Sequence, residues 1–112
     1  MQVFHEILAD RYLLFLADSQ PSPAASDSLE RCLLQAWRSR KPSVWVDCSR
    51  LHALAAAHYE LLLRYHQRLR RRGQQLVLCQ LSAPLQRAFE QLTDDLRPLL
   101  VPAPTAEGGA LA

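Results

Sequence analysis

SVWVDCSRLHALAAAHYELLLRYHQRLRRRGQQLVLCQL, residues Ser43 to Leu81, is the stretch that decides the fold. It opens with an apolar run, Val44 to Asp47, that is typical of a buried strand. Leucines at helical spacing follow, and arginines precede Gly73, which is a common signal for the end of a helix. A second apolar run, Gln75 to Leu81, predicts another strand. The stretch therefore indicates a β-α-β unit with two parallel strands.

Upstream of this unit, two further apolar runs predict an antiparallel hairpin. They span Gln2 to Leu8 and Tyr12 to Ala17, with a three-residue turn between them. A loop rich in proline and serine follows. Asp27 and Glu30 then form a capping box, which predicts a helix that begins at Asp27 and ends before Pro42.

Downstream of the unit, Ser82 and Pro84 precede an amphipathic stretch and predict a third helix capped by Ser82. Leu99 to Val101 predict a short final strand. Residues 102–112 are small and rich in proline and glycine, so we expect a disordered tail after one domain over residues 1–101. The predicted fold is α/β, with a mixed sheet of four to five strands, an N-terminal hairpin and three main helices.

Composition excludes several classes of function. The 112 residues include 13 basic and 11 acidic side chains, a net charge of +2, whereas nucleic-acid binding needs a concentrated basic footprint. Charged residues interrupt the apolar runs, so we expect neither a signal peptide nor insertion into a membrane. Gly73 is the only glycine outside the tail, which argues against a phosphate-binding loop. The histidines lack metal-ligand spacing, so we expect no metal or cofactor.

The three cysteines, Cys32, Cys48 and Cys79, are odd in number and lie among apolar residues, which favours reduced core thiols in a cytoplasmic protein. Cys48 could be combined with His52 and Asp47 as nucleophile, base and orienting acid. Such a site also needs an oxyanion hole and a thiol with a lowered pKa, and the sequence indicates neither. A small cysteine-dependent hydrolase is therefore the least favoured interpretation, and we predict that the protein is not an enzyme.

At this point the chain resembles a STAS domain, the fold of bacterial anti-sigma-factor antagonists. The resemblance covers Leu13 to Leu92, and its strongest part is Val44 to Leu51, VWVDCSRL, which is similar to the third-strand pattern of that family. The register of the resemblance starts the second helix near Leu54. The leucine periodicity alone allows a start at Arg50 with Ser49 as the cap.

The resemblance also identifies a departure. Family antagonists usually carry Asp-Ser-Ser-Gly at the start of the second helix, and a partner kinase phosphorylates the second serine. Ala55 to His58 occupy those positions here, which places Ala57 at the phosphoacceptor position. Alanine has no hydroxyl group, so the resemblance implies a domain that is not switched by phosphorylation there. For His58, two interpretations stay open: packing on the sheet, or a pH-sensitive contact with a partner.

The family places its docking surface in the loop after the second strand, at the end of the third strand and at the start of the second helix. In this sequence the implied residues are Asp18, Ser19, Asp47, Cys48, Ser49, Ala55, Ala56, Ala57 and His58.

The resemblance implies a protein–protein regulatory module that acts in bacterial signalling and transcription control. Its implied partner is an anti-sigma-factor-type kinase or another signalling protein. The alternative is a STAS subunit of a membrane complex that transports lipids or anions. Homodimers through an exposed helix or sheet surface are compatible with both interpretations.

Overall fold

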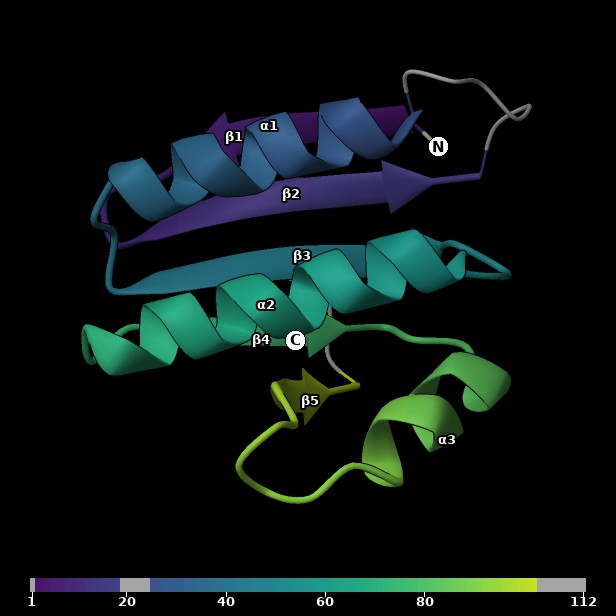
Figure 1. The fold of residues 1–112 in the computed structure, drawn as a ribbon. Coiled ribbons are helices and arrows are strands. Elements are labelled where there is room, and N and C mark those ends of the chain that lie inside the picture. Colours follow the sequence, from purple (N-terminus) through teal and green to yellow (C-terminus); the bar gives the residue numbers. More distant parts are fainter. Residues whose placement is uncertain (1, 19–24, 103–112) are drawn as a thin grey trace.

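The computed structural model describes residues 2–18 and 25–102. The chain forms five strands and three helices in this part (Figure 1). Their order is β1 (Gln2–Ile7), β2 (Arg11–Ala17), α1 (Ala25–Arg38), β3 (Ser43–Arg50), α2 (Ala56–Arg71), β4 (Gln75–Cys79), α3 (Ala83–Glu90) and β5 (Leu99–Val101). The predicted tail spans residues 102–112, and residues 103–112 of it lie outside the described residues, as do residues 19–24 of the predicted loop.

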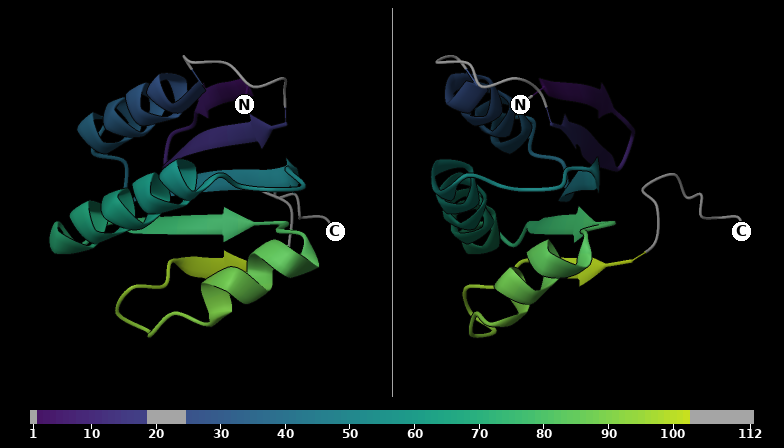
Figure 2. Two further views of the ribbon diagram at one scale, coloured as in Figure 1. Left: turned by 45° about the vertical axis from the view of Figure 1, so that its right-hand side comes forward. Right: turned by 90° about the vertical axis from the view of Figure 1, so that its right-hand side faces the viewer.

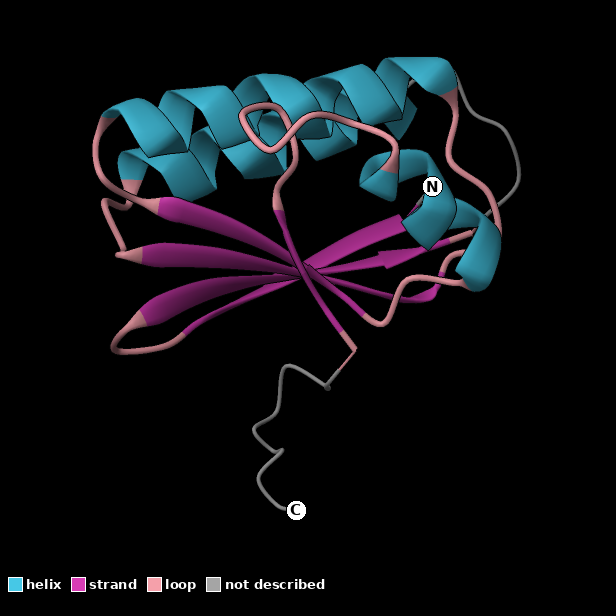
Figure 3. Ribbon diagram, turned by 90° about the horizontal axis from the view of Figure 1, so that it is seen from below, coloured by secondary structure: helices cyan, strands magenta, loops and turns pink. Residues whose placement is uncertain are grey.

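The strands form one mixed sheet in the order β1-β2-β3-β4-β5. β1 and β2 pair in antiparallel fashion, and every later pair is parallel. The predicted N-terminal hairpin, the β3-α2-β4 unit and the α/β fold class are therefore confirmed. Helices α1 and α2 lie side by side over one face of the sheet, and α3 lies beyond the end of β4 (Figures 2 and 3).

The face beneath α1 and α2, called here the helix-covered face, carries the hydrophobic core. Alternate residues of β2, β3 and β4 point into it, and each is at most 1% exposed. These strand residues are Leu14, Leu16, Val44, Val46, Cys48, Leu76 and Leu78. Full burial of one such aliphatic side chain stabilises the fold by about 1.5–3 kcal/mol, which explains why the helices stay docked.

No helix of the described chain covers the opposite face, called here the helix-free face (Figure 3). The intervening residues of the same strands lie on it, and their character is more mixed. They include Phe4 and Phe15 from the hairpin, Trp45 and Asp47 from β3, Val77 and Cys79 from β4, and Leu99 from β5. Phe4 is 57% exposed and Leu99 is 46% exposed.

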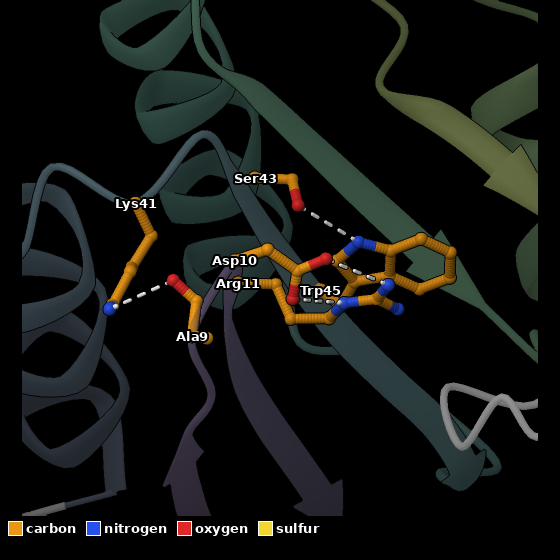
Figure 4. A network of polar contacts seen from close by, with 6 residues as sticks. All are labelled: Ala9, Asp10, Arg11, Lys41, Ser43 and Trp45. Atoms are coloured by element: carbon orange, nitrogen blue, oxygen red, sulfur yellow. Dashed lines mark hydrogen bonds and ion pairs between the residues drawn. The ribbon is translucent and has the colours of Figure 1, made fainter.

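Polar contacts fasten the edge of the sheet where β2 and β3 begin (Figure 4). The indole nitrogen of Trp45 donates to Ser43 Oγ at 3.1 Å, and the guanidinium of Arg11 lies 4.8 Å from the centre of the Trp45 ring. Lys41 Nζ donates to the carbonyl oxygen of Ala9 at 3.3 Å. The two contacts of Trp45 hold its ring in place on the helix-free face, and the Lys41 contact joins the β1–β2 turn to the segment before β3.

Several predicted boundaries were wrong. β3 continues through Arg50, so α2 cannot begin there with Ser49 as its cap; it begins at Ala56, with Ala55 at the N-cap. Helix α1 begins at Ala25, which puts Asp27 inside the helix and not at its cap. Strand β4 ends at Cys79, because Gln80 adopts a left-handed backbone conformation with φ of 57°.

The C-terminal end of α2 and the start of α3 agree more closely with the signals in the sequence. Gly73 has φ of 74°, and its N–H donates to the carbonyl of Arg70 at 3.0 Å, while Gln74 donates to Leu69 at 2.9 Å. This arrangement ends α2 in the way that the glycine predicts. Ser82 is the N-cap residue of α3, as predicted, but its hydroxyl makes no capping hydrogen bond.

Candidate functional site

The carboxyl ends of β2 and β3 lie together because the two strands are parallel neighbours. The Asp18 N–H donates to the carbonyl oxygen of Arg50 at 3.2 Å. The Asp18 carboxylate accepts the backbone N–H of His52 at 2.9 Å and contacts His52 Nδ1 at 2.7 Å. These contacts lower the pKa of the Asp18 carboxyl, chiefly through the hydrogen bond with the His52 ring. Asp18 therefore joins the two loops of this edge, whereas the predicted contact Ser19 lies outside the described residues.

Helix α2 begins at the same edge of the sheet (Figure 1), and its first residues have small side chains. Ala55, Ala56 and Ala57 are all exposed. Ala55 has no side-chain capping bond to offer, and the first turn of the helix contains no acid. The result is a small surface of methyl groups at a helix N-terminus that has no side-chain cap.

The next residue, His58, is only 7% exposed and faces inward. Burial lowers the pKa of its ring because it disfavours the charged form. The structure therefore favours the interpretation that His58 packs inside the domain, and its side chain is largely removed from the predicted surface.

The end of β3 divides its three predicted residues between the interior and the surface. Ser49 is exposed, and its N–H donates to Asp47 Oδ1 at 2.8 Å. Asp47 is 9% exposed, and Cys48 is 1% exposed within the core cluster. The prediction that Cys48 contacts a partner needs correction, because alternation along β3 turns its side chain into the core. Exposed Asp18, Ser49 and Ala55 to Ala57 together form what is called here the docking edge.

The structure does not bring Cys48, His52 and Asp47 together as the nucleophile, base and orienting acid that the sequence allowed. His52 contacts Asp18, on the surface, while the Cys48 thiol lies in the core and its Sγ is 3.7 Å from the carbonyl oxygen of Val46. Burial raises the pKa of the Cys48 thiol and raises that of Cys79 to about 12. A nucleophilic thiol needs the opposite shift, so the structure gives no support to a cysteine-dependent hydrolase.

Among the cavities formed by the described residues, two lie against the sheet. The larger, of about 800 Å³, lies between the C-terminal half of α2 and the segment that leads to β5, where it is lined by His66, Arg70 and Arg97 among others. The smaller, of about 320 Å³, lies beside the docking edge and was not expected from the sequence. Within residues 2–18 and 25–102, no group of three or more His, Cys, Asp or Glu side chains is placed to hold a metal ion. None of the described helices is long and apolar enough to cross a membrane.

Comparisons with solved structures identify the fold. The anti-sigma factor antagonist SpoIIAA in its unphosphorylated form superposes with a TM-score of 0.78 at 14% identity, over 96% of this chain and 94% of that one. A putative anti-sigma factor antagonist from Thermotoga maritima gives a TM-score of 0.73 at 8% identity, over 90% and 86% of the two chains. A variant of RsbS from Moorella thermoacetica gives 0.75 at 14% identity, over 96% and 92%.

At these identities the solved structures establish the fold alone. No curated protein matches the chain in sequence. The family model of the STAS domain matches residues 9–95, which include β2 through α3. Because this match spans more than half of the sequence, the chain belongs to the STAS domain family.

Proposed function

We propose that this STAS domain is a protein-binding regulatory module that resembles the anti-sigma-factor antagonists and acts in the cytoplasm. Its partner in this proposal is an anti-sigma-factor-type kinase or another signalling protein. The observation that carries the proposal is the exposure of Ala55, Ala56 and Ala57 beside Ser49 and Asp18 at one edge of the sheet. Three other residues that the resemblance implied, Asp47, Cys48 and His58, are buried.

The chemistry of the docking edge favours an apolar contact. Methyl groups lose little conformational entropy when they are covered, and they leave no polar group unsatisfied. The start of α2 has no side-chain cap and no acid in its first turn, so nothing negative in this turn opposes an acceptor from the partner. We therefore propose a flat contact centred on Ala57, with polar contacts from Ser49 and Asp18 at its margin.

We further propose that the contact is not switched by phosphorylation at the usual position. A phosphate group at a helix N-terminus adds about −1.5 to −2 charge, and this charge can prevent docking. Ala57 has no hydroxyl group to accept phosphate. Ser49 is the exposed hydroxyl of the docking edge. Incubation with ATP and the cognate kinase should leave the mass of the protein unchanged, and phosphate on Ser49 would contradict this part of the proposal.

The docking edge is tested by Ala57→Asp. The new carboxylate lies in the first turn of α2, where an acid stabilises a helix by about 0.3–1 kcal/mol, so folding should not suffer. Burial of this charge beneath a partner should weaken binding by at least about tenfold. The partner is first captured from a lysate of the source cell, and the variants are then compared by calorimetry.

Ala9→Asp is the matched control. It adds the same charge at an exposed alanine in the β1–β2 turn, at the opposite edge of the sheet. Its affinity for the partner should equal that of the unmodified protein. Equal affinity of the Ala57→Asp variant would remove the docking edge from the proposal, and capture of an ATPase or a permease would select the transport-complex alternative.

A further inference from the structure

A cross-strand row on the helix-free face leads to the smaller cavity. Phe4 pairs with Phe15 between β1 and β2, Phe15 pairs with Asp47 between β2 and β3, and Asp47 pairs with Cys79 between β3 and β4. Directly opposite residues on one face of a sheet have neighbouring side chains. The row thus places one carboxyl group between an aromatic ring and a thiol.

A bulge in β3 follows this row at once. The pairing moves from Phe15 and Asp47 to Ala17 and Arg50, so β2 advances by two residues while β3 advances by three. The extra residue of a bulge bends its strand and changes the direction of nearby side chains. Here the Ser49 N–H turns back to Asp47 Oδ1 at 2.8 Å.

The Asp47 carboxylate makes few contacts with the described residues, although the residue is only 9% exposed. Its Oδ1 accepts one hydrogen bond, from Ser49, and its Oδ2 makes none with the described residues. A buried carboxylate normally has several hydrogen bonds or a cationic partner, because desolvation of a charge costs several kcal/mol. Within the described chain, no Lys, Arg or His nitrogen lies within 4.0 Å of this carboxylate.

The cavity of about 320 Å³ gives access to this carboxylate. It is lined by Phe4, Phe15, Leu16, Ala17, Asp47, Ser49 and Arg50. Two aromatic rings and one carboxylate form the usual environment of a bound cation, which is attracted both by the negative charge and by the faces of the rings. Ser49 belongs to the cavity and to the docking edge, so the two surfaces are continuous.

We propose that this cavity receives the guanidinium group of an arginine side chain from the protein partner. A planar guanidinium can stack on Phe4 or Phe15 while one of its N–H groups donates to Asp47 Oδ2. The source of the arginine rests on the proposed function, whereas the chemistry of the cavity does not.

Arg50 is the cation that belongs to the cavity wall, and it supplies an internal test. It is exposed and forms no ion pair with Asp47. It nevertheless repels an incoming guanidinium and can compete for Asp47. Arg50→Gln removes this competition and should strengthen binding of an arginine by several-fold.

The experiment uses two small probes on the isotope-labelled full chain. Nα-acetyl-arginine amide is titrated while the backbone amide of Ser49 is followed by NMR, and the isosteric but neutral Nα-acetyl-citrulline amide is the control. The arginine probe should bind at least about tenfold more tightly, which corresponds to about 1.4 kcal/mol. Equal shifts with both probes would overturn the proposal.

Two variants test the residues. Asp47→Asn keeps an oxygen acceptor for the Ser49 N–H and should abolish the preference for arginine over citrulline. Phe4→Leu alters a side chain that is 57% exposed, so the fold should tolerate it, and it should weaken binding of the arginine probe by about threefold to fivefold. An unchanged preference in a folded Asp47→Asn variant would overturn the proposal. If that variant fails to fold, an unchanged affinity of the Phe4→Leu variant for the arginine probe would overturn it.

The captured partner provides the last measurement. Asp47→Asn should weaken its binding, and Ala57→Asp should weaken it independently. If the arginine probe binds but the partner affinity is insensitive to Asp47→Asn, the cavity does not receive the partner and the proposal fails. If Ala57→Asp alone has no effect, the docking edge fails and the cavity stands.

Discussion

The two faces of this sheet are built by the same strands and yet differ in almost every property. Val46 and Asp47 are consecutive residues of β3, but the first lies in an aliphatic core beneath the helices and the second lies under a cavity on the helix-free face. The helix-covered face is uniform and closed, whereas the helix-free face combines aromatic rings, a carboxyl group and exposed leucine. The difference teaches that the helix-covered face carries the aliphatic core that fixes the fold, whereas the helix-free face also holds polar and exposed groups.

The strongest test of this comparison uses one leucine from each face. Leu78 of β4 is fully buried on the helix-covered face, and Leu99 of β5 is 46% exposed on the other. Leu78→Ala should lower the free energy of unfolding by about 2–5 kcal/mol, and Leu99→Ala should lower it by less than about 1 kcal/mol. Urea denaturation measures both values, and similar losses would break the comparison.

Acidification should lower the free energy of unfolding through two buried histidines of α2, on the helix-covered face. Burial lowers the pKa of His58 and of His66 below the ordinary value of 6.5. Arg70 lowers the pKa of His66 further, while the backbone of Asp95 opposes the shift. Below about pH 6.5 the histidines of the unfolded chain therefore bind protons more readily than those of the folded protein. The free energy of unfolding should have its full value above this pH and should decrease as the pH falls below it.

Urea denaturation from pH 7.5 down to pH 5 measures this effect. His66→Leu should flatten the dependence, because it removes one of the two buried rings. His5→Gln is the control, since His5 is exposed on β1. An identical slope in the His66→Leu variant would show that this histidine does not contribute.

A smaller effect is expected from the contact that fastens the helix-free face. The guanidinium of Arg11 lies over the Trp45 ring, and cation–π contacts of this kind contribute about 0.5–1 kcal/mol (Figure 4). Arg11→Gln should lower the free energy of unfolding by that amount and change the fluorescence of Trp45. Arg71→Gln, at an exposed position of α2, should do neither.

The smallest difference is expected between the thiols of the two faces. Cys48 and Cys79 lie on opposite faces, yet they are 1% and 0% exposed, and burial raises the pKa of both. In Cys48→Ala and Cys79→Ala variants, the remaining buried thiol should react with an alkylating reagent at the rate of unfolding, and the two rates should be alike. Faster reaction of Cys79 would show that the helix-free face opens separately.

Most of the fold was predictable because its signals are local. The apolar runs of β2 and β3, the leucine stripe of α2 and the glycine at its end each depend on a few neighbouring residues. The start of α2 was not predictable from periodicity, because Ala55 offers no capping side chain and Leu51 fits the helical stripe. In the structure, Leu51 donates its N–H to the carbonyl of Cys48 at 3.0 Å, in a turn before the helix.

The candidate site was less accessible to sequence reasoning. The docking edge could be proposed because parallel strands bring their carboxyl ends together. The cavity depends on the register that sets Phe4, Phe15 and Asp47 in one row, and on a bulge that forms only when β3 pairs with β2. Phe4 and Asp47 are 43 positions apart, so no local spacing in the sequence predicts that they lie in one row.

The order of the strands in the sheet has a consequence for synthesis on the ribosome. Each strand pairs with the one before it in the chain, from β1 to β5. When a new strand has been translated, the strand with which it pairs has therefore already been made. No strand has to be inserted later between two strands that already pair. Since translation delivers about 5–20 residues per second, the domain can extend strand by strand as the chain emerges.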